Sequence, residues 1–255
     1  MHSSGRWKQR MGAPSLLLVL AAAVLAYPIQ AQAAGGAFAV DDAEVGKPGE
    51  CKVESWASFA TNSARDFIGV ISPACVANLG RPVELGAQFQ RSRADGEWGT
   101  SLGLKAKTNI LPVEAGKLGL GIAVNAPFDL ITKQSTGFAV NVPATYQFSE
   151  KFKVNVNAGW LYERVDRLNW LTWGAGFEWQ FADKFTFIGE AFGQLGKLPA
   201  VDEGDPPPPN SIREPRLQLG VRFTPVESLD VDLIYGRNIT GENANWVTLG
   251  LNVRF

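Results

Sequence analysis

The chain has 255 residues, and 24 Lys and Arg residues against 25 Asp and Glu residues give it a formal net charge of −1. A chain without a basic excess does not predict binding to nucleic acid, which depends on clustered cationic side chains. The length is that of one domain preceded by a targeting segment.

Residues 1–33 are predicted to form a secretory signal peptide. Three basic residues precede an apolar run over residues 16–26, and residues 31–33 read Ala-Gln-Ala, the small-x-small form of a cleavage site. The apolar run is too short for a spanning helix, which argues against the alternative of a membrane anchor. Removal of this segment leaves 21 basic residues against 25 acidic ones and no histidine, because His2 is the only one in the chain.

Residues 34–50 are expected to form a short periplasmic lead-in. They contain Asp41 and Asp42, followed by Gly and Pro residues. Because apolar and polar residues do not alternate here, the segment does not predict a strand. The folded domain, a predicted outer-membrane β-barrel, is therefore expected to span residues 51–255.

Cys51 and Cys75 predict a disulfide. Cys51 begins the first predicted strand and Cys75 follows the second. In an up-and-down barrel, the start of the first strand and the end of the second lie on the same rim, and the periplasm is oxidising. Two buried free thiols are the alternative.

The remaining chain predicts an all-β fold: a transmembrane antiparallel up-and-down β-barrel of about 12 strands, with about 10 to 14 as the range. Apolar and polar residues alternate with period two in segments separated by Gly, Pro, Asn and Asp. In residues 152–162, for example, Val154 and Val156 share one face while Lys153 and Asn155 share the other. The predicted strands are 51–60, 67–72, 83–89, 102–108, 118–126, 138–148, 152–162, 171–181, 185–193, 217–223, 229–235 and 247–255.

The connections between these strands alternate in length. Tight turns within 148–152, 181–185 and 224–228 alternate with longer polar connections around 163–169, 196–215 and 236–245. This asymmetry is typical of outer-membrane barrels, whose periplasmic turns are short and whose outer loops are long. The longest connection contains four consecutive prolines, which predict a loop; it is either a spacer or a binding loop.

The last predicted strand resembles the closing strand of bacterial outer-membrane β-barrels. Its apolar residues alternate up to Val253 and Phe255. In the barrels that it resembles, the terminal aromatic residue is read by the assembly machinery. The resemblance therefore implies that Val253 and Phe255 form an assembly signal. It also implies localisation in the cell outer membrane after export through the periplasm, with outer-membrane lipid, lipopolysaccharide and the assembly machinery as partners.

If the apolar face of the strands meets lipid, the polar face lines the lumen. The charged residues expected there are Glu84, Lys105, Lys107, Lys117, Lys153, Glu178, Glu190, Arg222, Asp230, Asp232 and Arg254. They pair across a filled interior or line a water-filled passage, and about twelve strands are compatible with both. The balance of signs predicts weak ion selectivity. The four lysines could favour anionic solutes, or pair with Glu84 and nearby acids.

Residues 37–56 suggest a family. Residues 37–44 read Ala-Phe-Ala-Val-Asp-Asp-Ala-Glu, and residues 46–56 read Gly-Lys-Pro-Gly-Glu-Cys-Lys-Val-Glu-Ser-Trp. They resemble the mature start of the transporter-like outer-membrane barrels grouped with the meta-pathway phenol-degradation proteins, which often open with an Asp-Asp lead-in and a Pro-Gly turn. The resemblance implies passive passage of small molecules, aromatic ones included. It brings no functional residues that map onto this chain.

The sequence predicts a channel or facilitator for small solutes, not an enzyme. Barrel hydrolases use a histidine base, and the mature chain has none. No cofactor or metal site is expected. The alternative function is a non-conducting structural or adhesion-type barrel with a filled lumen and partner-binding outer loops. A soluble secreted barrel with its apolar face inward is a third interpretation, because alternation defines a face and not its direction.

Overall fold

The computed structural model describes residues 37–61, 65–94, 96–196, 211–239 and 245–255. The predicted signal peptide and the four consecutive prolines lie outside these residues. Within them, no helix has the length and hydropathy needed to cross a membrane.

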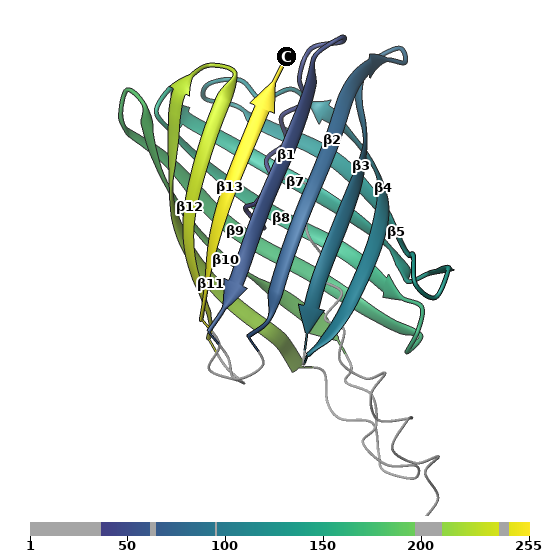
Figure 1. Cartoon of the computed structure of the whole chain (residues 1–255). Coiled ribbons are helices and arrows are strands. Elements are labelled where there is room, and N and C mark those ends of the chain that lie inside the picture. Colours follow the sequence, from purple (N-terminus) through teal and green to yellow (C-terminus); the bar gives the residue numbers. More distant parts are fainter. Residues whose placement is uncertain (1–36, 62–64, 95, 197–210, 240–244) are drawn as a thin grey trace, which may run out of the picture.

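Almost all of the described chain is strand (Figure 1). The strands are β1 (Cys51–Ala60), β2 (Phe67–Asn78), β3 (Pro82–Ala94), β4 (Glu97–Leu111), β5 (Leu118–Asp129), β6 (Gln134–Ser135), β7 (Gly137–Ser149), β8 (Phe152–Glu163), β9 (Leu168–Ala182), β10 (Phe185–Gly196), β11 (Ser211–Val226), β12 (Leu229–Asn238) and β13 (Asn245–Arg254).

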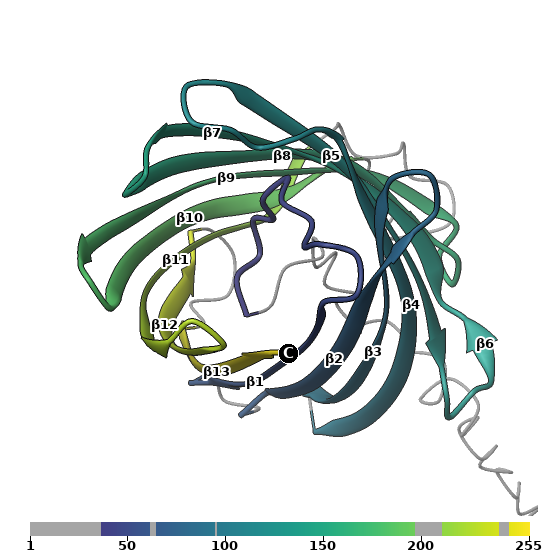
Figure 2. The same cartoon turned by 90° about the horizontal axis from the view of Figure 1, so that it is seen from above.

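The strands form one closed antiparallel barrel. Each long strand pairs with the next along the chain, and β13 pairs with β1 over nine residue pairs to close the ring. The two-residue β6 pairs only with β5 and lies outside the ring, so the wall has twelve strands (Figure 2). This confirms the predicted fold class and all twelve predicted strands.

Several strands are longer than the alternation predicted. β2 was expected to end at residue 72, yet it continues to Asn78. Although Pro73 lacks a backbone donor, it lies opposite Val53 in the β1–β2 register, and the pairing continues on both sides of it.

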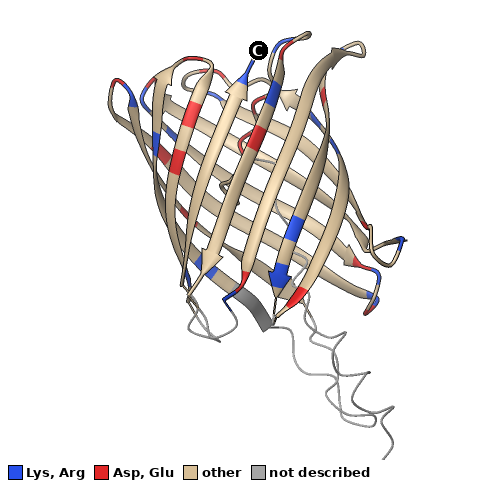
Figure 3. Ribbon diagram, viewed as in Figure 1, with Lys and Arg blue, Asp and Glu red and all other residues tan. Residues whose placement is uncertain are grey.

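The apolar face of the strands points away from the lumen. In β13, Leu249 and Leu251 are exposed, whereas Thr248 and Asn252 on the opposite face are buried. Charged residues gather toward the ends of the strands, with a largely uncharged band between them (Figure 3). This is the surface of a barrel embedded in a membrane, so the protein is an outer-membrane barrel and not a soluble barrel with its apolar face inward.

Aromatic residues line the rim at the end of the barrel where Phe255 lies. The rings of Phe181 and Phe185 are 6.1 Å apart, and those of Phe185 and Phe223 are 4.9 Å apart. Such rings suit the membrane–water interface. Trp170 is different, because it is 1 % exposed and its Nε1 donates to Glu163 at 3.1 Å.

Every connection at the end of the barrel where Phe255 lies has six residues or fewer (Figure 1), although the β3–β4 connection at the opposite end is also short, with two residues. Residues 79–81, 112–117, 150–151, 183–184 and 227–228 form these turns, whereas the connections at the opposite end are mostly longer. Short turns mark the periplasmic side of such barrels, which assigns the Phe255 end to the periplasm.

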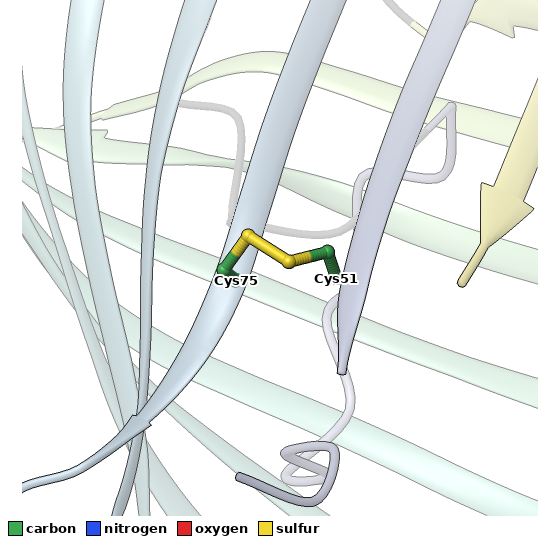
Figure 4. The surroundings of a disulfide bond; sticks show 2 residues. All are labelled: Cys51 and Cys75. Atoms are coloured by element: carbon green, nitrogen blue, oxygen red, sulfur yellow. A yellow bond between two sulfur atoms is a disulfide. The ribbon is translucent and has the colours of Figure 1, made fainter. Parts of the chain in front are cut away.

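A disulfide joins Cys51 of β1 to Cys75 of β2 (Figure 4). The two residues are directly opposite in the antiparallel register, with 4.0 Å between their Cα atoms. On its other side Cys51 meets Phe255: its N–H donates to the Phe255 carbonyl at 2.8 Å and its carbonyl accepts from Phe255 at 2.9 Å. The disulfide therefore fastens the strand that closes the barrel to its neighbour.

We expect the double substitution C51S/C75S to lower the stability of the barrel by about 2–4 kcal/mol, because the bond closes a loop of 24 residues in the unfolded chain. The urea midpoint of the purified protein in detergent measures this. Mass spectrometry after reduction and alkylation of the wild-type chain is the control. An unchanged midpoint would show that the strand pairing alone fixes β1.

Candidate functional site in the barrel lumen

Residues 37–44, here called the lumen segment, run inside the barrel (Figure 2). Phe38, Val40, Asp41 and Ala43 are each less than 7 % exposed. The sequence predicted a periplasmic lead-in for residues 34–50. Residues 37–44 of it instead lie in the lumen, enclosed by the wall. The lumen is thus partly filled by the chain's own amino-terminal portion.

Side chains of the wall bind the backbone of the lumen segment. The N–H groups of Ala39 and Val40 donate to the two carboxylate oxygens of Glu190 at 3.0 and 3.1 Å. The Ala43 N–H donates to Thr145 Oγ1 at 2.8 Å. A buried backbone without secondary structure needs such partners. Glu190 and Thr145 therefore replace the strand pairing that this segment lacks.

Asn157 of β8 pairs with Asp41 as one strand pairs with another. The Asp41 N–H donates to Asn157 Oδ1 at 2.8 Å, and Asn157 Nδ2 donates to the Asp41 carbonyl at 2.7 Å. Asn141 Nδ2 donates to the same Asn157 oxygen at 3.2 Å. These two donor contacts to the buried amide fix its orientation, and with it the position of Asp41.

Small residues on the inner face of the wall make room for the segment. A Cβ atom at Gly220 would lie 3.0 Å from the Phe38 ring, and one at Gly174 would lie 2.9 Å from a Val40 methyl. Phe38 packs on Ile188 and Ile234, and the Arg222 guanidinium lies 5.3 Å from the centre of its ring. The wall is therefore shaped to hold apolar side chains inside an otherwise polar lumen.

Two lysines of the wall hold the carboxylates of the segment. Lys107 Nζ of β4 lies 2.8 Å from Asp41 and 3.2 Å from Asp42. Lys153 Nζ of β8 lies 3.3 Å from Asp42 and 3.2 Å from Glu44. Lys153 also lies 3.3 Å from Glu178 of β9. The cluster holds four carboxylates and two ammonium groups.

Burial and the neighbouring charges shift the pKa values of the segment's acids in opposite directions. Burial raises the pKa of Asp41 to about 7, against the opposing effect of Lys107. Burial also acts on Asp42, but the nearby Lys107 and Lys153 outweigh it and hold the pKa of that carboxyl well below its usual range. The charge of Asp42, together with burial, raises the pKa of Glu44. The lysines thus favour ionised Asp42 over ionised Asp41.

A cavity of about 610 Å³ lies beside the lumen segment at the Phe255 end of the barrel. Nine Asp and Glu side chains and five Lys and Arg side chains line it. Four of these acids, Asp41, Asp42, Glu44 and Glu50, come from the chain before β1. No group of His, Cys, Asp and Glu residues in the described ranges has the arrangement of a metal site.

The structure places most of the predicted lumen residues inside the barrel. The cavity is lined by Glu84, Lys107, Lys153, Glu178, Glu190, Arg222 and Arg254. Lys105, Asp230 and Asp232 are buried on the same inner face. Arg222 Nε lies 2.8 Å from Asp232, and Arg254 pairs with Asp230.

Lys117 does not line the lumen. It lies just before β5, in the turn after β4, and its exposed side chain pairs with Glu114 at 2.6 Å. The predicted strand begins at residue 118, as β5 does, so Lys117 was counted with the lumen face although it lies one residue before the strand. Lys107 and Lys153 pair with acids, which was one of the two alternatives for the lysines, but their partners are carboxylates of the lumen segment and, for Lys153, also Glu178 of β9.

The sequence reasoning missed the lumen segment itself. Residues 37–44 carry Phe38 and Val40 among three alanines and three acids, which is too weak a pattern to indicate burial. The stronger signal was on the wall, where Gly174, Gly220 and Gly250 occupy inward positions of alternating strands. Inward glycines indicate that another chain approaches closely.

We expect K107M to loosen the lumen segment, because it leaves Asp41 and Asp42 buried without their shared cation, a loss of about 3–5 kcal/mol for a buried pair. Hydrogen–deuterium exchange at the amides of residues 39–43 should become faster while the strand amides stay protected. The matched control is K117M, which removes an exposed ion pair and should leave exchange unchanged. Equal protection in K107M and the wild type would show that Lys107 does not anchor the segment.

Solved structures with the same fold support the architecture. The KdgM porin superposes with a TM-score of 0.57 at 6 % identity, over 80 % of this chain and 99 % of that one. The NanC porin gives a TM-score of 0.59 at 6 % identity, over 79 % and 98 %. The COG4313 outer membrane channel from Pseudomonas putida F1 gives 0.57 at 14 % identity, over 84 % and 98 %.

Comparison with curated proteins finds no match to this chain. The sequence does match one family model, over residues 21–255, which includes every strand of the barrel. The chain therefore belongs to the family described as Uncharacterised conserved protein UCP029691.

Proposed function

We propose that this protein is an outer-membrane channel for small solutes, whose passage is narrowed by the lumen segment. The observation that supports this proposal is the polar cavity of about 610 Å³ inside a closed barrel, which is bounded by the segment and by the charged inner wall. A barrel of twelve strands is wide enough to hold more than its own side chains. Solutes would pass between the segment and the wall, or through the space that the segment leaves when it moves.

The similar structures support this proposal at the level of fold. One of them is a KdgM porin solved in complex with disordered oligogalacturonate, at 7 % identity and a TM-score of 0.56. The resemblance of residues 37–56 to the transporter-like barrels of the meta-pathway phenol-degradation group supports passage of small molecules as well. The mature chain would still lack the histidine base that barrel hydrolases use.

The lumen segment also favours a second candidate, a non-conducting barrel with a filled interior. The segment crosses the lumen and forms hydrogen bonds with β7, β8 and β10. In that case the outer loops would carry the function by binding a partner. The two candidates differ in conductance.

We expect channel events in planar bilayers, with a larger single-channel conductance when residues 37–44 are deleted or when Lys107 is replaced by Met. Both changes empty or loosen the passage while the wall keeps its strands. K117M is the matched control and should conduct like the wild type. If wild type, K107M and the deletion all lack channel events at every voltage, the channel proposal fails and the filled barrel stands.

We also propose that Phe255 is part of the signal read by the outer-membrane assembly machinery, in a membrane of lipid and lipopolysaccharide. Phe255 is 73 % exposed, so removal of its side chain deletes little packing. F255G keeps both backbone hydrogen bonds to Cys51 and should lower the amount of assembled protein in outer-membrane fractions. F181G, which removes an exposed ring at the same rim, is the control. Equal amounts of F255G and wild type would remove this role.

A further inference from the structure

The cluster around the lumen segment has more negative than positive groups. Lys107 and Lys153 contact four carboxylates between them. The other cations that line the cavity are engaged by wall acids: Lys52 by Glu54 and Glu84, Arg222 by Asp232, and Arg254 by Asp230. No cation of the described lining is left over for the excess carboxylates.

Two buried acceptor oxygens of residues that line this cavity have no donor among the described residues. They are Asp41 Oδ2 and Asn252 Oδ1, on side chains that are 3 % and 5 % exposed. The orientation of Asn252 is fixed, because its Nδ2 donates to Asp232 Oδ2 at 3.1 Å. Buried acceptors without donors are rare in folded proteins. Both therefore point to a missing partner that donates hydrogen bonds.

We propose that this cavity binds a small solute through a primary ammonium group. An ammonium carries positive charge and three N–H donors, which match the excess carboxylates and the free acceptor oxygens. The inference rests on the proposed function in one respect, that solutes reach the lumen, and it names their class as cationic. Of the four lysines that could have favoured anions, Lys107 and Lys153 are already paired with carboxylates of the lumen segment, and Lys117 is paired with Glu114 outside the lumen.

The titration of Asp41 gives the binding a pH dependence. Its pKa is raised to about 7 by burial, and the charged groups that face it are Lys105 and Lys107 of β4, Lys52 of β1 and Asp42 beside it. A proton and an ammonium compete for the same carboxylate. Below pH 7 the protonated acid disfavours the cation, and above pH 7 the ionised acid favours it, so affinity rises with pH through this range.

Isothermal titration of the full mature protein in detergent tests the proposal without requiring conduction. The probes are n-butylammonium, butyrate as its anionic counterpart, and tetramethylammonium, which has the charge but no N–H donor. We expect one n-butylammonium per barrel, bound about tenfold more weakly at pH 6 than at pH 8. Butyrate should not bind, and tetramethylammonium should bind less tightly.

Two variants test whether n-butylammonium binds in the cavity or elsewhere on the protein surface. D41N keeps the shape of the side chain and replaces the free acceptor oxygen with a donor or a neutral acceptor. We expect it to weaken n-butylammonium binding about tenfold, the loss of one charge-assisted hydrogen bond, and to abolish the pH dependence. E114Q makes the same change of charge in an exposed turn at the same end and should bind like the wild type.

The inference is overturned if butyrate binds as tightly as n-butylammonium, if tetramethylammonium binds equally well, or if D41N binds like the wild type. Amide exchange of residues 39–43 in D41N checks that the lumen segment is still in place. If the barrel binds the ammonium but shows no channel events, the proposed function is overturned and the inferred binding site still stands. Channel events without ammonium binding would overturn the site alone.

Discussion

The interaction on which the lumen depends is the buried contact of Lys107 with Asp41 and Asp42. Its parts are separated by more than 60 residues, and Lys107 and Asp41 are almost inaccessible to water. A buried ion pair is seldom the best source of stability, but removing one partner leaves a charge without compensation. The segment is therefore favoured in the one position that pairs all three groups, because any other position leaves a buried charge without compensation.

The other contacts of the segment favour the same position. Glu190, Thr145 and Asn157 satisfy backbone groups that have no strand partner, and the Phe38 site excludes water at one end. Each contact is specific to one register of the segment, because a shift by one residue would put the polar side chain of Asp41 in the place of apolar Val40. Polar wall and apolar pocket together define a single position for eight residues of otherwise irregular chain.

The wall could be predicted from sequence because lipid imposes a period of two on it. Val154 and Val156 of β8 alternate with Lys153 and Asn155, so even this single strand shows both faces. The boundaries were less predictable, since Pro73 is tolerated inside β2 and Lys117 lies just outside β5. The alternation of apolar and polar residues indicates which residues form strands, whereas hydrogen bonding to the neighbouring strands determines where the strands end.

The lumen segment could not be predicted, because its structure is determined by residues far along the chain. Asp41 resembles any acid of a polar lead-in until Lys107 and Asn157 are placed beside it. Likewise, Glu190 was predicted as a lumen residue, but its role as acceptor for Ala39 and Val40 depends on the fold. Alternation predicted the charged lumen residues other than Lys117, but it did not predict their partners.

The position of the segment has a consequence for the order of events during assembly. Its contacts come from β4, β7, β8 and β10, which lie on different parts of the ring. The segment precedes all of these strands in the chain, so it is made first and finds its last partners late. An incomplete sheet offers only some of these partners, and all of them are in place only after the strands from β4 to β10 have paired. Docking of the segment therefore reports that this part of the wall has formed.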